Sequence, residues 1–428
     1  MQKVLIITYY WPPAGGPGVQ RWLKFVKYLR EFNIEPVVYI PENPSYPIVD
    51  ESFQNEISDT ISIYRHKIFE PYRLAGLLSK KKTKSISSGI IENKQQPIVE
   101  RLLLWVRGNF FIPDARKYWV KPSVNFLNDV IKKEGIETVI TTGPPHSVHL
   151  IGHQLKKKLA VNWVADFRDP WTSIGYHKKL KLSVASQKKH KKLERLVLNT
   201  ADSILVTSST TKTEFSTITD KPIHLITNGY DEVAMLDEAL DSKFTLAHIG
   251  SLLAGRNPLA LWEALSELIS EHADLKDVLE IKLAGVVSKD VLNSIYSYGL
   301  ESVTTLIGYV SHEKALELMH KSQGLLLIEI DSEETKGIIP GKLFEYMAAN
   351  RPVLGIGPAG WDVTSILAET KHGNTFTYTQ KKELKALLLE WYKAYKQNKL
   401  HVTKGDITAY SRKELTKKLA AHLHGYSS

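Results

Sequence analysis

The sequence predicts an α/β protein made of two Rossmann-like domains whose parallel sheets face a central cleft. First, the 428 residues exceed one typical core of about 100 to 200 residues. Second, short apolar segments alternate with amphipathic ones along the chain, and this scheme restarts near Phe244. Strands that alternate with helices form parallel sheets with right-handed crossovers, and ligands bind at the carboxyl ends of such strands.

The first half opens with the apolar strand KVLIITYY, the turn WPPAGGPG and an amphipathic helix in VQRWLKFVKYLREF. Val19, Trp22, Val26 and Leu29 share one face of that helix, which we expect to cover a sheet. Further strands are expected at PVVYI, ETVITT, NWVADF, SILVTS and HLITNG, with helices between them. The expected first domain spans residues 1–225 and carries an insert at about 76–120.

The second half repeats the alternation over the expected domain 226–405. Strands are predicted at TLAHIG, EIKLAG, TTLIGYV, GLLLIEI and PVLGIG. Helices are predicted from Pro258, from Ser311 and from Lys342, and two helical segments, KKELKALLLEWYKAYKQ and SRKELTKKLAAHLHG, follow them.

Composition agrees with a cytoplasmic enzyme. The chain has no cysteine, which excludes disulfide scaffolds, cysteine nucleophiles and thiolate metal sites. No apolar run approaches the roughly 20 residues that cross a bilayer, and MQKVLIITYYWPP is typical of a buried strand, not of a signal peptide. The formal charge of +10 favours anionic partners, which include sugar nucleotides, nucleic acid and acidic lipids.

Two neighbouring segments of the insert differ in character. SKKKTKSISSGIIENKQQ is polar, serine-rich and aperiodic, so it is predicted to be a mobile loop. In PIVERLLLWVRGNFFIPDARKYWV, aromatic residues such as Trp105 alternate with basic ones such as Arg101 and Arg107. This pattern suits a segment that rests on an anionic membrane, and equally a core helix with solvated basic edges. Basic residues elsewhere are spread out and form no nucleic-acid-binding motif.

The segment PGKLFEYMAANRPVLGIGP, from Pro340 to Pro358, suggests a nucleotide site. Lys342 begins the predicted helix, where free N–H groups and the helix dipole favour phosphate. Glu345 shares its face and could accept hydrogen bonds from a ribose diol. A surface ion pair is the alternative. Arg256, in the loop GSLLAGRNP, supplies a second cation at the same edge, or is a solvated loop arginine.

A glycine-rich loop follows the first strand. Gly15, Gly16 and Gly18 would let backbone amides approach a phosphate or a sugar, or they form a plain turn. Arg21 stands where a dinucleotide fingerprint has its third glycine, and this substitution argues against an NAD enzyme.

Two further segments end predicted strands. His146 follows ETVITT and is either a site residue or a capping or core histidine. His149 and His153 could share its face, but no carboxylate or cysteine ligand accompanies them, so no metal site is predicted. In DFRDPW, the acidic residues could line the side of the expected cleft where a substrate hydroxyl would bind, and Asp169 could orient that hydroxyl. Equally, Arg168 could pair with an aspartate and shape the loop.

An ordered set of segments resembles the family 4 glycosyltransferases. The P-x-K-x-x-E-Y-M-A helix precedes an R-P-V-L-G strand, as in the donor-binding signature of that family. The other matching segments are YYWPPAGGPGVQRWLKFVKYL, TTGPPHSVHLIGHQLKKKL, VADFRDPW, ADSILVTS, ITNGYDE and HIGSLLAGRNPLALWEAL, which together span most of the chain. The resemblance implies the GT-B fold, a final helix at 406–428 that packs back on the first domain, and a retaining sugar transfer from a nucleotide-diphosphate sugar.

The resemblance also assigns roles to residues, without a metal or another cofactor. The donor-binding residues that it implies are Gly15, Gly16, Gly250, Arg256, Lys342 and Glu345. The catalytic residues that it implies are His146, Asp169, Arg256 and Lys342. Most family members carry another glutamate eight positions before Glu345, and this chain has Gly337 there unless Glu333 or Glu334 substitutes.

The expected function is therefore sugar transfer to a glycan or a polyprenyl-linked acceptor, in surface polysaccharide or lipid-linked glycan synthesis. Two alternatives stay open. One is a degenerate GT-B protein that binds nucleotide or membrane as a scaffold. The absence of the glutamate that most family members carry would agree with a loss of activity. The other is a UDP-sugar epimerase, although the mid-chain segments do not resemble that family.

Overall fold

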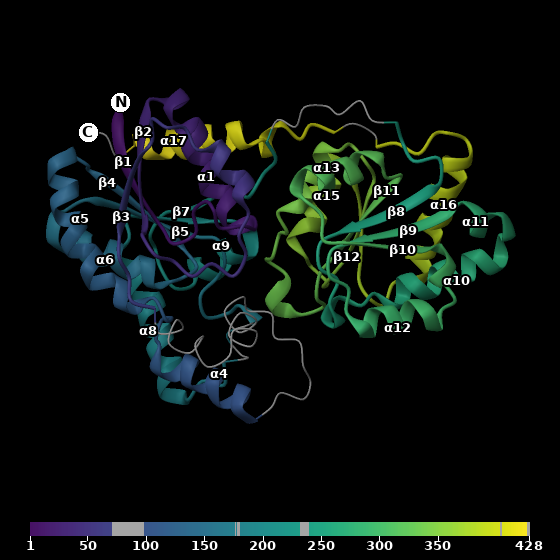
Figure 1. Ribbon diagram of the computed structural model, residues 1–428, viewed down its shortest axis with the longest axis horizontal. Helices are drawn as coiled ribbons and strands as arrows, with labels where there is room; N and C mark the ends of the chain where they lie inside the picture. The colour runs from purple at the N-terminus through teal and green to yellow at the C-terminus, as the bar shows by residue number, and fades with distance from the viewer. Residues whose placement is uncertain (71–97, 176, 178–179, 232–238, 403–404, 426–428) are drawn as a thin grey trace. The chain divides into compact units, whose positions relative to one another are not determined.

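The computed structural model describes residues 1–70, 98–175, 177, 180–231, 239–402 and 405–425. The predicted loop SKKKTKSISSGIIENKQQ lies outside these residues. The chain divides into two compact units (Figure 1). The first contains Met1–Asn228 and Arg412–Ser428, and the second contains Gly229–Ser411.

The first unit is built on a seven-stranded parallel sheet with the order β3-β2-β1-β4-β5-β6-β7. Its strands are β1 (Gln2–Thr8), β2 (Ile34–Pro41), β3 (Ser62–His66), β4 (Thr138–Gly143), β5 (Asn162–Phe167), β6 (Ser203–Val206) and β7 (Ile223–Leu225). Its helices are α1 (Pro17–Leu29), α4 (Ile98–Phe110), α5 (Val120–Glu134), α6 (Ser147–Leu159), α8 (Val184–Thr200), α9 (Ser209–Ser216) and α17 (Arg412–His424). The central strands are buried on both faces, which explains their continuous apolar sequences.

Helix α1 packs its apolar face into a core that residues from the far end of the chain complete. Val19, Trp22, Val26 and Leu29 are at most 3% exposed, as the helical pattern predicts. Leu415, Leu419 and Leu423 of α17 belong to the same cluster of buried side chains, and α17 contacts α1.

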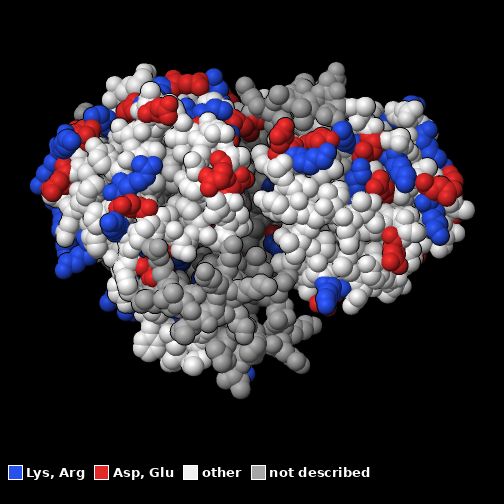
Figure 2. Space-filling model, viewed as in Figure 1, with Lys and Arg blue, Asp and Glu red and all other residues white. Residues whose placement is uncertain are grey.

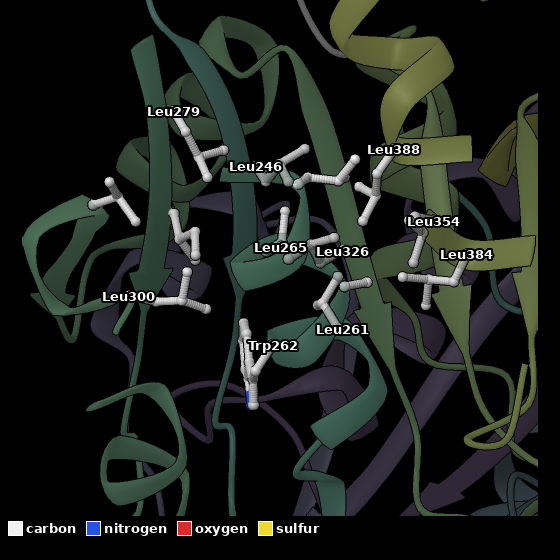
Figure 3. Close-up of a cluster of buried hydrophobic side chains, with 14 of the residues drawn as sticks. Leu246, Leu261, Trp262, Leu265, Leu279, Leu300, Leu326, Leu354, Leu384 and Leu388 are labelled. Carbon is white, nitrogen blue, oxygen red and sulfur yellow. The ribbon is translucent and has the colours of Figure 1, made fainter. Parts of the chain in front are cut away.

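The second unit repeats the plan with a six-stranded parallel sheet of order β10-β9-β8-β11-β12-β13. Its strands are β8 (Phe244–Ile249), β9 (Leu279–Ala284), β10 (Thr304–Gly308), β11 (Gly324–Ile328), β12 (Val353–Ile356) and β13 (Gly373–Phe376). Its helices are α10 (Leu259–Glu271), α11 (Ala273–Val278), α12 (Lys289–Ser297), α13 (His312–Lys321), α14 (Lys342–Ala348), α15 (Asp362–Thr370) and α16 (Lys381–Lys396). Leucines from β8, β11, α10 and α16 meet in one core (Figure 3).

The two strand orders are equivalent, because each sheet grows outward in both directions from its first strand. The order therefore reverses between β1 and β4 in one unit and between β8 and β11 in the other. The predicted pair of Rossmann-like domains with parallel sheets is confirmed. Among the described residues, no helix is long and apolar enough to span a membrane. On the face drawn in Figure 2, basic and acidic side chains are interspersed.

Candidate functional site

Lys342 and Gly250 meet at the carboxyl edge of the second sheet, where β8 and β11 diverge. Lys342 is the first residue of α14, and its Nζ donates a hydrogen bond of 2.9 Å to the carbonyl oxygen of Ile249, the last residue of β8. Gly250 follows with φ at 125°, and a Cβ atom there would lie 3.2 Å from the Lys342 Nζ. Position 250 therefore favours glycine for two reasons. Glycine adopts this positive φ without strain, and it leaves room for the Lys342 amine.

Arg256 reaches the same edge and is held by a buried carboxylate. It ends the short helix Ala254–Arg256, and its Nε and Nη2 donate to one oxygen of Glu329 at 3.0 and 2.8 Å. Glu329 directly follows β11 and is buried. Arg256 is thus an ordered, paired residue, and the interpretation as a solvated loop arginine is wrong. The sequence analysis missed Glu329, although an acid that ends the aliphatic strand GLLLI marks this edge of the sheet.

His248 of β8 contacts the Lys342 amine from the interior of the second unit. The sequence analysis also missed this residue. Its ring is fully buried, with Nδ1 at 3.0 Å from the carbonyl oxygen of Leu326 and Nε2 at 3.4 Å from the Lys342 Nζ. Burial, together with the nearby Lys342, holds the pKa of His248 well below its usual value, so the ring is neutral. Because a carbonyl can only accept, Nδ1 carries the proton and Nε2 accepts from Lys342. As the one ionisable residue of the strand Phe244–Ile249, this histidine could have been noticed in the sequence.

Glu345 lies three residues after Lys342 on α14 and is half-buried. One of its carboxylate oxygens is 3.7 Å from Nε2 of His312, the first residue of α13. The two candidates for the missing glutamate have partners of their own. Glu333 pairs with Lys336 at 2.7 Å, and Glu334 accepts a hydrogen bond from the Ser332 hydroxyl.

Arg168 organises the carboxyl edge of the first sheet by binding backbone oxygens. Its guanidinium donates to the carbonyls of Gly18, Gly143 and Pro144. A Cβ atom at position 18 would lie 2.7 Å from the Arg168 Nη1, which explains the glycine there. No described aspartate forms an ion pair with Arg168, so this alternative is not observed, and carbonyls hold the guanidinium in place.

Asp166 pairs with Arg21 in the interior. The Arg21 Nη2 lies 2.9 Å from Asp166 Oδ1, and both side chains are 0% exposed. The indole N–H of Trp22 and the hydroxyl of Thr142 donate to the other carboxylate oxygen, at 2.7 and 2.8 Å. Asp166 therefore links α1, β4 and β5, and the prediction that it could line an acceptor site is wrong.

In the glycine loop, the amide of Gly15 already donates a hydrogen bond, whereas Gly16 has free space beside its Cα atom. The Gly15 N–H donates to the carbonyl of Ile48 at 3.0 Å, so this amide already has a partner. Gly16 precedes α1 with φ at 95°, and no atom lies within 4 Å of where its Cβ would be. Of these two glycines, Gly16 has open space beside it.

His146 lines a cavity of about 200 Å³ in the first unit. It is 4% exposed and stacks on Trp171, with ring centroids 4.7 Å apart. Neither ring nitrogen has a hydrogen-bond partner among the described residues. Burial, followed by the neighbouring His149, holds the pKa of His146 well below its usual value. Other residues that line the cavity include Tyr10, Arg107, Phe111, Arg116, His177 and His190.

The remaining candidates in the first unit differ in their surroundings. His149 belongs to the core, because its Nδ1 lies 2.9 Å from the Thr141 hydroxyl and its ring stacks on Phe167. Asp169 follows Arg168 in the loop after β5 and is half-buried. Burial raises the pKa of Asp169, and the charge of Arg168 opposes this shift. The charged form of Asp169 is therefore less favourable here than in water, and a hydrogen bond donated to it, for example by a hydroxyl group, would stabilise it.

Comparison with known proteins establishes the fold. No protein-family model matches the sequence, and no curated protein matches it either. Among solved structures, Alr3699/HepE of Anabaena in complex with UDP-glucose is 12% identical with a TM-score of 0.62, covering 99% of this chain and 100% of that one. A lipopolysaccharide outer core galactosyltransferase, WaaB, is 13% identical with a TM-score of 0.58, covering 99% of both chains. A putative UDP-N-acetylglucosamine 2-epimerase of Listeria monocytogenes is 13% identical with a TM-score of 0.55, covering 100% and 97%. The chain has the GT-B fold.

Proposed function

We propose that this chain is a glycosyltransferase that moves a sugar from a nucleotide-diphosphate sugar to an acceptor, with retention of the anomeric configuration. The observation that carries the proposal is the meeting of Lys342, Arg256 and Glu345 where β8 and β11 diverge. In open α/β sheets, ligands bind at this point of the strand order. The fold is shared with a protein bound to UDP-glucose and with a galactosyltransferase, which supports the proposal.

In this proposal the two cations act on the diphosphate. Negative charge develops fully on the diphosphate only as the glycosidic bond breaks, so Lys342 and Arg256 would stabilise the transition state more than the bound donor. Glu345 would accept hydrogen bonds from the ribose diol. His146 would orient the donor sugar and Asp169 the acceptor hydroxyl, and neither a metal nor another cofactor takes part.

The proposed acceptor is a glycan or a polyprenyl-linked glycan at an anionic membrane. Helix α4 supports this, because Leu102, Leu103, Trp105 and Phe110 are 41% to 60% exposed on it. The neighbouring α8 exposes Lys188, Lys189, Lys191 and Lys192. An apolar helix face beside exposed lysines matches the interface of a bilayer with acidic headgroups.

Nucleotide binding tests the donor site. The full chain is titrated with UDP, GDP, ADP, dTDP and CMP, and binding is followed by the melting temperature and by calorimetry. One diphosphate should stabilise the chain. Lys342→Ala and Glu345→Ala should each weaken its binding about tenfold to about a hundredfold, since each loses a hydrogen bond that involves a charge. Lys382→Ala, on the exposed side of α16, is the matched control and should bind like the parent.

Other outcomes would favour the alternatives. If no nucleotide raised the melting temperature, the donor site would be degenerate and the scaffold hypothesis would replace the transferase. If the chain converted UDP-N-acetylglucosamine to an epimer without any acceptor, it would belong with the epimerase that shares its fold. A transferase should instead consume a nucleotide sugar only when an acceptor is present.

A further inference from the structure

The Lys342 amine is partly buried, and its hydrogen-bond partners do not match a permanent positive charge. The groups around it are His248 of β8, Arg256 of the following loop, Glu329 after β11, and Glu345 and Tyr346 of α14. Its two hydrogen-bond partners, the Ile249 carbonyl and the His248 Nε2, are neutral acceptors. No described carboxylate forms an ion pair with Lys342, since Glu329 is bound to Arg256 and Glu345 lies beside His312.

An ammonium group in this position is unfavourable. It loses part of its water, forms no ion pair with a described carboxylate and is repelled by the charge of Arg256. Burial and the charge of Arg256 lower the pKa of Lys342 to about 7, against the opposing effect of Glu329 and Glu345. A neutral amine, by contrast, can donate both of its hydrogens to the two acceptors already in place.

We propose that the Lys342 amine, held by two neutral acceptors, takes up one proton when a diphosphate binds, with His248 as the residue that positions the amine. The proposal rests on the proposed function for the identity of the ligand. The proton comes from solvent and joins the Nζ lone pair, so an amine becomes an ammonium group and no other bond changes. A bound diphosphate would supply a negative charge beside an amine whose present acceptors are neutral.

This coupling fixes the sign of a pH dependence. Below about pH 7 Lys342 is already charged, and its titration leaves affinity unchanged. Above that pH each binding event must take up a proton, so affinity for the diphosphate should fall about tenfold per pH unit until the amine no longer charges in the complex. A nucleotide sugar such as UDP-glucose is the suitable probe, because both of its phosphates are esterified and stay fully ionised across this range.

The protonation of Lys342 can be measured without any nucleotide. The full chain is treated with trace acetic anhydride between pH 6 and pH 10, and acetylation of each lysine is quantified by peptide mass spectrometry. Only the neutral amine reacts, so Lys342 should become reactive with a midpoint near pH 7, well below the range usual for a lysine in water. A Lys342 midpoint near pH 10 would overturn the proposal, whatever the chain binds.

Variants at position 248 test the positioning role. His248→Leu removes the acceptor, and since an ammonium loses more than an amine by this, the Lys342 midpoint should fall by about one pH unit. His248→Gln, whose side-chain oxygen can replace Nε2, should restore it. An unchanged midpoint in His248→Leu, in a chain with a parental melting temperature, would remove His248 from the proposal.

Calorimetry then separates this inference from the proposed function. UDP-glucose is titrated at pH 8 in two buffers with different ionisation enthalpies, which reports the protons taken up. The parent should take up about one proton and Lys342→Met none. Binding without proton uptake would leave the donor site intact and overturn the coupling. An absence of binding would contradict the proposed function, and the acetylation midpoint would still decide the state of Lys342.

Discussion

Arg21 reaches from α1 into the interior and meets Asp166 of β5, with no exposure of either side chain. A third hydrogen bond from its guanidinium ends on the carbonyl of Thr227, at 2.8 Å. Arg21 thus connects α1, which follows the glycine loop, with strand β5 and with the segment around Thr227. Its net contribution to stability is small when both partners are present, but the loss of one partner leaves a buried charge without compensation.

Arg21→Met should therefore destabilise the chain by about 3 to about 5 kcal/mol. The measurement is urea-induced unfolding of the first unit at pH 7. Adding Asp166→Asn to this variant should recover part of the loss, because no uncompensated charge then remains. Lys3→Met, which breaks a partly exposed pair with Glu134, is the control and should cost about 1 kcal/mol or less. Equal losses in the two single variants would contradict this account.

The cost of Arg21→Met should also depend on pH. Burial alone would raise the pKa of Asp166, but Arg21 and the hydrogen bonds from Trp22 and Thr142 lower it below its usual value. A lowered carboxyl pKa contributes stability above the unfolded value of about 3.9 and loses it as pH falls further. The difference between parent and Arg21→Met should thus be largest near neutral pH and shrink below pH 4. A constant difference down to pH 3 would show that Arg21 acts through packing alone.

Helix α4 packs against the segment that leads into α8 and carries exposed apolar side chains. Gly108 packs so closely on the segment before α8 that a Cβ at position 108 would lie 2.5 Å from a methyl group of Leu182. The side-chain oxygen of Asn109 accepts a hydrogen bond of 2.8 Å from the backbone of Ser183, just before α8 begins. The sequence pattern left open whether this helix was a core element. Its exposed apolar side chains are the basis on which we propose a membrane interface.

Vesicle binding tests this surface. The chain should sediment with vesicles of phosphatidylglycerol at low salt, and binding should weaken as salt screens the lysines of α8. The double variant Trp105→Ser with Phe110→Ser should lose about tenfold in affinity, because two aromatic side chains no longer enter the interface. Tyr309→Ser, which removes an aromatic residue that is 79% exposed in the second unit, is the matched control. Equal binding to vesicles of phosphatidylcholine alone, or an unchanged double variant, would exclude an anionic membrane as the partner of α4.

Both sheets were predictable because their central strands are unbroken apolar runs that alternate with helices of clear period. The edge strands β3 and β13 were missed, since they are short and partly exposed and therefore lack that pattern. The same limit applies to the site. Lys342 and Glu345 share one helix and can be inferred from spacing, whereas His248 and Glu329 join them only through the pairing of β8 with β11. Contacts between strands far apart in sequence leave no local pattern.

The chain passes between the two units twice, and this makes their folding unequal. The second unit is one continuous segment, Gly229–Ser411, with its own buried clusters on both faces of the sheet. The first unit is completed only by α17, whose Leu415, Leu419 and Leu423 cover α1. Three buried leucines contribute roughly 5 to roughly 9 kcal/mol, which is comparable to the whole stability of a typical domain.

The fragment 229–411 should therefore fold alone, whereas the fragment 1–228 should not. The first should unfold cooperatively in urea, and any nucleotide that stabilises the full chain should stabilise it as well, with Lys342→Ala abolishing the effect. The fragment 1–228 should lack a cooperative transition and regain one when the peptide 405–428 is added or fused to it, because the peptide restores the cover of α1. If 1–228 unfolded cooperatively without that peptide, α17 would be dispensable for the first core. If 229–411 were unfolded, the two units would depend on each other for stability, and their division into separate cores would not describe how the protein folds.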